Sequence, residues 1–215
     1  MSNAIILIGA GGHASVLADM LLESGHVIAG IVSIISAKRV DLATITRYAT
    51  DEEFMKKCKP NEVTLVNGLG SLPVSTTRFD LHKKFKEAGY TFMQVVSPTA
   101  IISRHATLDE GAQVMPGAII NSGTNIGACS IINTGAIVDH DCQIGPYNHI
   151  APGAVLSGGI HTGEYVHVGT GAVIIQGVTI GSYSVVGAGA CVSKNIGANK
   201  IVYPAKPFIT GRQTP

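Results

Sequence analysis

One histidine of this chain stands between two acids, in the triplet Asp139-His140-Asp141. An imidazole with a pKa near 6.5 exchanges a proton readily at neutral pH, which suits it to general base catalysis. A neighbouring carboxylate would orient the second ring nitrogen and stabilise the protonated ring. The triplet therefore predicts removal of a proton from a nucleophile. The alternative is a solvated surface histidine without a chemical role.

The segment that carries this triplet has a six-residue repeat. From Ile102 to Val192 every sixth position is Ile, Leu or Val, with Thr162 as the exception. A helix has a period of 3.6 residues and a plain strand a period of two, so neither keeps a six-residue stripe on one face. Small residues recur four positions after each member of the stripe, at Ala106, Ala112, Ala118, Thr124, Ser130, Ala136, Cys142, Ala154, Ala172, Ser184 and Ala190.

A period of six fits a short strand, a corner and another short strand, so three units would close a triangular coil of 18 residues. We expect the aliphatic residues to point inward and successive coils to pair as parallel strands, about 4.8 Å apart. His140 would then lie at an outward corner, and one coil further Gly158 would leave space above it. Glycines that directly follow the stripe are expected at corners with unusual backbone angles: Gly127, Gly145, Gly163, Gly169, Gly181 and Gly187.

The first part of the chain alternates predicted strands with helices, which favours a small parallel sheet. The pattern Gly9-x-Gly11-x-x-Ala14 lies between the first strand and the first helix, a context suited to phosphate binding at a helix N-terminus. A tight turn without a ligand and a redox dinucleotide site are the alternatives. The second is weakened because Ser33 stands where an acid is expected. We predict strands at 5–8, 27–32, 62–66 and 90–96, and helices at 13–24 and 79–88.

Composition bounds the function classes. Hydrophobic residues make up 46% and charged residues 13%, which favours a folded chain. The net charge of +1 gives no electrostatic reason to expect nucleic acid or an anionic membrane as partner. No apolar run reaches the roughly 18 to 20 residues of a membrane span, and the N-terminus lacks a basic leader. The four cysteines form no CxxC pair, so we expect free thiols and a cytoplasmic location.

Together the two parts resemble the bacterial sugar acetyltransferases of the sialic-acid O-acetyltransferase type, a family that includes enzymes that N-acetylate UDP-linked 4-amino-4,6-dideoxy sugars. The resemblance implies a Rossmann-like α/β domain at residues 1–97 and a left-handed parallel β-helix at 98–215. One departure is at Ser33-Ile34, where relatives that bind a UDP-amino sugar often have paired aspartates. The resemblance rests on Ile8-Gly9-Ala10-Gly11-Gly12-His13, Val66-Asn67-Gly68-Leu69-Gly70, Ser97-Pro98-Thr99-Ala100, Val138-Asp139-His140-Asp141-Cys142-Gln143-Ile144-Gly145 and Pro204-Ala205-Lys206.

The family pattern also implies roles for single residues. It makes His140 the general base and Asp141 its acidic partner, where relatives often carry Glu. The expected contacts to acetyl-CoA are His149, Gly158, Gly187, Ala188, Lys206 and His167, the last stacked one coil above His149. The expected contacts to the sugar nucleotide are Gly11, Gly12, His13, Asn67 and Gly68.

The resemblance implies a homotrimer that uses acetyl-CoA and no metal to acetylate the amino group of a nucleotide-linked 4-amino-dideoxy sugar for surface glycan synthesis. The first alternative is O-acetylation of sialic acid or a related sugar. Two further alternatives belong to other classes. One is a zinc enzyme whose histidines converge between subunits, and the other is a catalytically silent scaffold or nucleotide-binding regulator.

Overall fold

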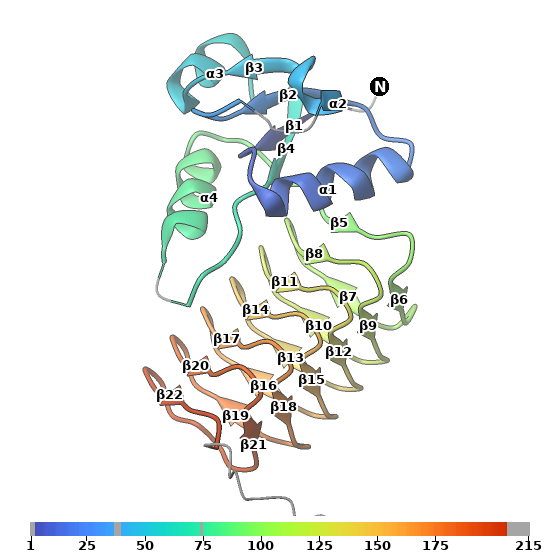
Figure 1. Cartoon of the computed structure of the whole chain (residues 1–215), viewed down its shortest axis with the longest axis vertical. Helices are drawn as coiled ribbons and strands as arrows, with labels where there is room; N and C mark the ends of the chain where they lie inside the picture. The colour runs from blue at the N-terminus through green and yellow to red at the C-terminus, as the bar shows by residue number, and fades with distance from the viewer. Residues whose placement is uncertain (1–2, 37–39, 74, 206–215) are drawn as a thin grey trace, which may run out of the picture.

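A small α/β unit sits on one side of a long prism of stacked coils (Figure 1). The computed structural model describes residues 3–36, 40–73 and 75–205. None of the helices in these ranges is long and apolar enough to cross a membrane.

The α/β unit is built on a parallel sheet with strand order β3-β2-β1-β4. The predicted strands at 5–8, 27–32 and 62–66 and both predicted helices are confirmed within two residues at each end. The strand β3 and the helix α3 that lie between the second and third predicted strands were not anticipated. The elements are β1 (Ala4–Ile8), α1 (Gly12–Glu23), β2 (Ile28–Val32), α2 (Val40–Ala43), β3 (Thr46–Tyr48), α3 (Asp51–Lys57), β4 (Val63–Asn67) and α4 (Thr77–Glu87).

The predicted strand at 90–96 is wrong as one element of this sheet. Phe92 makes only a single bridge to Leu65 of β4, and the next residues turn into the prism. There Val95 and Val96 form β5 (Val95–Val96), which pairs with the second coil. The apolar run is divided between two sheets because Val95 packs into the junction of the two parts of the chain.

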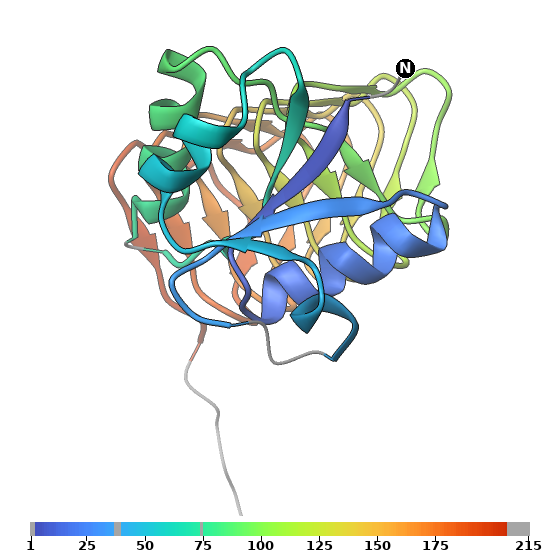
Figure 2. The ribbon, with the colours of Figure 1, turned by 90° about the horizontal axis from the view of Figure 1, so that it is seen from above.

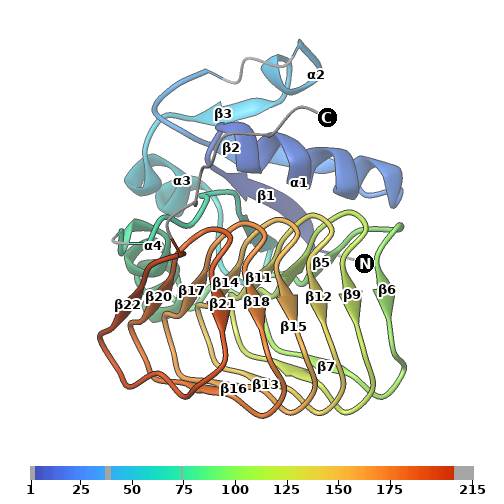
Figure 3. The same ribbon diagram turned by 60° about the horizontal axis from the view of Figure 1, so that its bottom comes forward.

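The prism has three faces of short parallel strands, and Figure 3 shows the coils end-on. Paired residues are 18 apart through most of its length, as in Ile131 and His149. Face 1 contains β5, β8 (Gln113–Val114), β11 (Ile131–Ile132), β14 (His149–Ile150), β17 (His167–Val168), β20 (Val185–Val186) and β22 (Ile201–Val202). Face 2 contains β6 (Ile101–Ile102), β9 (Ile119–Ile120), β12 (Ile137–Val138), β15 (Val155–Leu156), β18 (Val173–Ile174) and β21 (Cys191–Val192). Face 3 contains β7 (Thr107–Leu108), β10 (Asn125–Ile126), β13 (Gln143–Ile144), β16 (His161–Thr162) and β19 (Thr179–Ile180).

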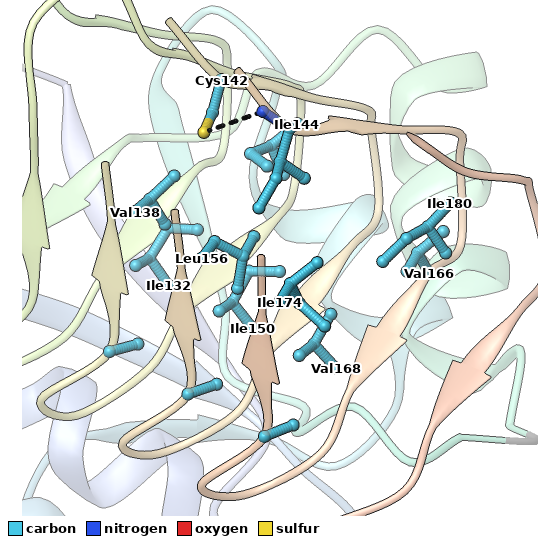
Figure 4. Close-up of a cluster of buried hydrophobic side chains, with 14 of the residues drawn as sticks. Ile132, Val138, Cys142, Ile144, Ile150, Leu156, Val166, Val168, Ile174 and Ile180 are labelled. Atoms are coloured by element: carbon cyan, nitrogen blue, oxygen red, sulfur yellow. Dashed lines mark hydrogen bonds between the residues drawn. The ribbon is translucent and has the colours of Figure 1, made fainter. Parts of the chain in front are cut away.

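This architecture confirms the predicted parallel β-helix and extends the repeat by one strand at each end, β5 and β22. The second residue of each strand points inward, and those from Val114 to Val192 form one continuous hydrophobic core (Figure 4). Thr162 is accommodated there because its hydroxyl bonds with the buried Asn148 amide and accepts from the Gly145 N–H. A buried polar group is tolerated when it is hydrogen-bonded in this way.

The glycines that directly follow the aliphatic stripe have a different role from the predicted one, because none of them has a left-handed φ. A Cβ at Gly127 would lie 2.6 Å from the Gly145 carbonyl carbon of the next coil, so the constraint is close packing between coils. Left-handed angles occur instead three residues after the stripe. Gly111 has φ of +69° there, and Tyr147, Tyr165 and Tyr183 adopt similar angles.

The outward positions of the three faces differ in chemistry. Face 3 presents only polar residues: Thr107, Asn125, Gln143, His161 and Thr179. Face 2 presents an apolar stripe: Ile101, Ile119, Ile137, Val155, Val173 and Cys191. Face 1 is covered near its first coils by the α/β unit, seen from above in Figure 2. Met115 and Ile131 join the α1 core there, and Phe79 of α4 packs edge-on against Tyr147 and Tyr165.

Candidate active site

His140 lies at the corner between faces 2 and 3, between β12 and β13. Its Nδ1 is 2.8 Å from Oδ2 of Asp141, and the two side chains are 53% and 72% exposed. A carboxylate only accepts hydrogen bonds, so Nδ1 carries the proton and Nε2 has the free lone pair. The hydrogen bond to Asp141, with the charges of Asp139 and Asp141, raises the pKa of His140 above its usual value.

Two glycines of neighbouring coils make room for this pair. A Cβ at Gly158 would lie 2.5 Å from Cε1 and 3.0 Å from Cδ2 of His140, and it would also meet Nε2. A Cβ at Gly123 would meet the Asp141 carboxylate. Asp141 itself has φ of +57°, a conformation that Asp tolerates better than most residues. The imidazole therefore occupies the space that the sequence predicted above the corner.

The backbone of the corner is held by Asp139. Its Oδ1 accepts hydrogen bonds from the His140 N–H and from the Asn121 amide, both at 2.8 Å. These bonds lower the pKa of Asp139. The two acids of the triplet therefore act on different atoms, since Asp141 orients the ring and Asp139 fixes the main chain. The sequence gave no reason to single out Asn121, which stands one coil before Asp139.

His149 and His167 lie on face 1, so they do not converge with His140 within one chain. Their rings stack edge-to-face at 4.8 Å, as the 18-residue spacing predicted. Asn133 uses its carbonyl oxygen for the Thr134 N–H and donates to His149 Nε2 at 2.9 Å. His149 therefore carries its proton on Nδ1, and burial, followed by repulsion from neighbouring cationic groups, lowers its pKa to about 3.

The His167 ring borders a small hollow between face 1 and the loop that follows β4. Its Nδ1 is buried without a hydrogen-bond partner among the described residues, and burial lowers its pKa. The hollow has a volume of about 200 Å³, and its wall includes stacked tyrosine rings and hydroxyl groups. The prism side of the wall is formed by Tyr147, Tyr165, Val166, His167 and Tyr183, and the loop side by Ser71, Leu72, Pro73, Ser75 and Thr76.

His13 lies at the junction between the α/β unit and the prism. Its Nε2 is 2.8 Å from Oε1 of Gln113 in β8, whose amide nitrogen donates to the Asn67 carbonyl. Because that oxygen is an acceptor, Nδ1 of His13 carries the lone pair. Burial and the nearby Arg78 lower the pKa of His13 to about 4. Gln113 is a residue that sequence reasoning missed, since its partner stands 100 positions away.

Asn67 and Gly68 are placed in the packing beneath the sheet edge. Asn67 is 2% exposed, and its side chain donates to the Arg78 carbonyl and accepts from the Leu69 N–H. A Cβ at Gly68 would lie 2.6 Å from the Ile8 carbonyl oxygen. The structure thus brings the backbone of this turn, but not the Asn67 side chain, toward a ligand.

A cavity of about 590 Å³ opens at the carboxyl ends of β1 and β2. Gly11 lies in its wall as the N-cap of α1, beside Gly12 at the first helical position, and no side chain caps this helix end. Ligands of parallel sheets bind at this edge, and a helix N-terminus attracts phosphate. The other wall residues are Ile8, Gly9, Ala10, Val32, Ser33, Ile34, Ile35, Ala49, Thr50, Asp51, Glu52, Leu69 and Leu81.

The amides predicted to hold acetyl-CoA differ in availability. Among the described residues, the N–H groups of Gly158 and Ala188 have no acceptor. The N–H of Gly187 already donates to the Val202 carbonyl at 2.8 Å. Lys206 lies outside the described residues. No group of three or more His, Cys, Asp and Glu in the described ranges is arranged to hold a metal ion.

Comparison with known proteins adds to this geometry. The family profile described as the PglD N-terminal domain matches residues 4–77, and comparison with curated proteins gives no match. PerB from Caulobacter crescentus, solved with CoA and GDP-perosamine, is 31% identical with a TM-score of 0.81 over 94% of each chain. The acetyltransferase domain of PglB from Neisseria gonorrhoeae FA1090 is 28% identical with a TM-score of 0.82, over 96% of this chain and 100% of that one. WeeI from Acinetobacter baumannii AYE, at 24% identity and a TM-score of 0.75 over 94% and 97%, shares the fold.

The likeness to PerB covers both the α/β unit and the prism, because nearly the whole of each chain is aligned. The PglB acetyltransferase domain matches over the same span and has also been solved with acetyl coenzyme A. The profile match and the six-residue repeat of the prism agree with these likenesses. The chain therefore belongs to the family of hexapeptide-repeat sugar acetyltransferases.

Proposed function

We propose that the protein transfers an acetyl group from acetyl-CoA to the amino group of a nucleotide-linked 4-amino-dideoxy sugar, with His140 as the general base. The observation that carries this proposal is the His140–Asp141 pair, with its proton on Nδ1 and its free Nε2 facing the Gly158 backbone. The relatives bound to CoA and GDP-perosamine support the same chemistry.

The amine nitrogen attacks the thioester carbonyl carbon, and a nitrogen–carbon bond forms. His140 Nε2 takes the proton that the nitrogen loses, while Asp141 stabilises the resulting imidazolium. The carbon–sulfur bond then breaks, and the imidazolium proton passes to the leaving sulfur. The free N–H groups of Gly158 and Ala188 are suited to hold carbonyl groups of acetyl-CoA along the prism.

The acceptor is expected to bind in the cavity of the α/β unit, with its diphosphate at the N-terminus of α1. This cavity lies on the face 1 side, whereas His140 lies at the corner between faces 2 and 3. The chemistry thus requires a second subunit to bring the two together. His149 and His13 would approach the reacting groups from the subunit that binds the nucleotide.

We propose a homotrimer in which face 2 is the contact surface. Its outward stripe is aliphatic, and Ile101 and Val173 are 65% and 41% exposed in the single chain. Face 3 is polar and face 1 is covered near the α/β unit, so face 2 is the surface that gains most from burial. Closed cyclic symmetry is the usual arrangement for such contacts. His140 stands at the edge of face 2, where a neighbouring chain would reach it.

Acetyl-CoA is the proposed donor, and surface glycan synthesis is the proposed setting. The four cysteines are free thiols, which fits the cytoplasmic location that we propose, since thiols persist in a reducing compartment.

The test is a thiol-release assay with acetyl-CoA and a panel of nucleotide-linked 4-amino sugars, with free sialic acid alongside. We expect CoA release with an amino sugar and a decrease of roughly 10²- to 10⁴-fold in His140→Ala, the usual effect of losing a general base. His161→Ala is the matched control, because His161 is an exposed histidine of face 3. Release with sialic acid alone would replace the N-acetyltransferase proposal with O-acetylation. Normal turnover in His140→Ala would remove this residue from the mechanism.

A further inference from the structure

The cavity of the α/β unit has a charged pair on one wall that the proposed mechanism does not use. Asp51 and Glu52, in the first turn of α3, both line the cavity. Lys84 of α4 contacts both, with Nζ 2.8 Å from Asp51 Oδ2 and 2.9 Å from Glu52 Oε1. Leu81, one helical turn before Lys84, lines the same cavity. A cation and carboxylates are therefore held side by side at this wall.

The two ends of the cavity differ in charge, which orients a nucleotide within it. The glycine turn at Gly11 and Gly12 offers backbone N–H groups and the positive end of α1. The Asp51–Glu52 end would repel a diphosphate. A nucleoside diphosphate therefore binds with its phosphates at the glycine turn and its base toward α3.

Apolar side chains flank the space that remains for the base. Ile34 and Ile35, which follow β2, are 86% and 59% exposed in the empty cavity. The flat faces of a nucleobase would cover such side chains and remove them from water. The edge of the base would then meet the Lys84 and Asp51 side chains.

Only one common base complements this pair along its pairing edge. Guanine presents, in order, the O6 acceptor, the N1–H donor and the N2–H₂ donors. Lys84 supplies a donor for O6, and the carboxylate supplies acceptors for the two nitrogens. Among the described residues, Oδ1 of Asp51 accepts no other hydrogen bond. Uracil and thymine place a second acceptor where guanine has N2–H₂, and a carboxylate would repel it. Adenine and cytosine have an amino donor at the position of O6, opposite the Lys84 ammonium.

We propose that the Lys84–Asp51 pair, with Glu52 supporting it, selects a guanine nucleotide, so that the acceptor sugar is carried by GDP. This inference rests on the proposed function, because it names the nucleotide of the proposed acceptor. It also accounts for Ser33 and Ile34 at the end of β2. The acidic contact has moved from the second strand to α3, where Lys84 gives it a cationic partner.

The experiment is titration calorimetry of GDP, UDP, dTDP and ADP against the full chain, which measures nucleotide binding without acetyl transfer. We expect GDP to bind most tightly. Asp51→Asn and Lys84→Met should each weaken GDP by roughly 5- to 150-fold, the discrimination that a good bidentate base contact provides. UDP affinity should change little in these variants. Lys83→Met is the control, because Lys83 pairs with Glu87 on the exposed surface. If Asp51→Asn does not fold, Glu52→Gln tests the same wall.

The outcomes separate this inference from the proposed function. Tightest binding of UDP or dTDP would overturn guanine selection and leave the amino-sugar acetyltransferase standing. Equal loss of all four nucleotides in Lys84→Met would show that the pair only supports the fold, which also overturns the inference. Absence of binding by every nucleoside diphosphate would overturn the inference and remove the nucleotide from the proposed acceptor as well.

Discussion

Replacing Gly158 with alanine tests the corner geometry more sharply than removing His140. Gly158 has an ordinary φ, so alanine fits its backbone, and the three atoms nearest to an added Cβ all belong to the His140 ring. Cε1 would lie at 2.5 Å, whereas ordinary van der Waals contact begins near 3.4 Å. The ring must therefore shift by about 1 Å or rotate away, which breaks its alignment with Asp141.

A shift of about 1 Å in a reacting group costs on the order of 10²-fold in rate, or about 2.7 kcal/mol in the barrier. Stability should change little, because the ring is 53% exposed and can swing into solvent. The melting temperature of Gly158→Ala should therefore stay close to that of the parent while the rate of CoA release falls.

A double-mutant cycle with His140→Ala completes the test. With the ring absent, Gly158→Ala should have almost no further effect on the residual rate. Gly197→Ala is a suitable control, because Gly197 has open space around its Cβ position and no left-handed φ. If Gly158→Ala retains near-normal turnover, or slows the His140→Ala variant as much as the parent, the steric argument is wrong.

Three other predictions follow from the same geometry. Asp141→Asn should lower kcat and move the acidic limb of the pH–rate profile to lower pH, because the carboxylate raises the pKa of His140; an unmoved limb would mean that Asp141 does not set this pKa. Val155→Lys on face 2 should give monomers without activity, whereas Gln143→Lys on face 3 should not, as light scattering after size exclusion can show; a trimeric Val155→Lys variant would place the contact elsewhere. Stability should fall as pH decreases from 6.5 toward 4, because unfolded chains protonate His13 and His149 near pH 6.5 while burial keeps their folded pKa values at about 4 and 3. At pH 5 this amounts to about 2 kcal/mol for each fully buried imidazole, and urea midpoints that are equal at pH 7 and pH 5 would contradict it.

The prism was predictable almost residue by residue, because its period of six excludes both helices and plain strands. The stripe from Ile102 to Val192 fixes which side chains face inward, and hence which corner carries His140. The role of the glycines after the stripe was not predictable. A glycine can relieve either a backbone angle or a steric contact, and only the neighbouring coil shows which of the two applies.

The α/β unit was less accessible to sequence reasoning. β3 has only three residues, and its apolar alternation is too short to recognise. A signal for α3 was present, since Thr50 accepts from the Glu53 N–H and the Glu53 carboxylate accepts from the Ala49 N–H, a pattern close to a capping box. That signal would have placed Asp51 and Glu52 at a helix start. Their meeting with Lys84 depends on the packing of α4, about 30 residues later, which no local pattern reveals.

The constant separation between paired strands has a consequence for how the chain acquires its structure. Each coil pairs only with the coils 18 residues before and after it, so no long loop has to close before the next coil forms, and loop closure costs little conformational entropy. Growth can therefore proceed coil by coil from the N-terminal end as the chain emerges from the ribosome. In such a quasi-one-dimensional array, each finished coil serves as the template for its successor.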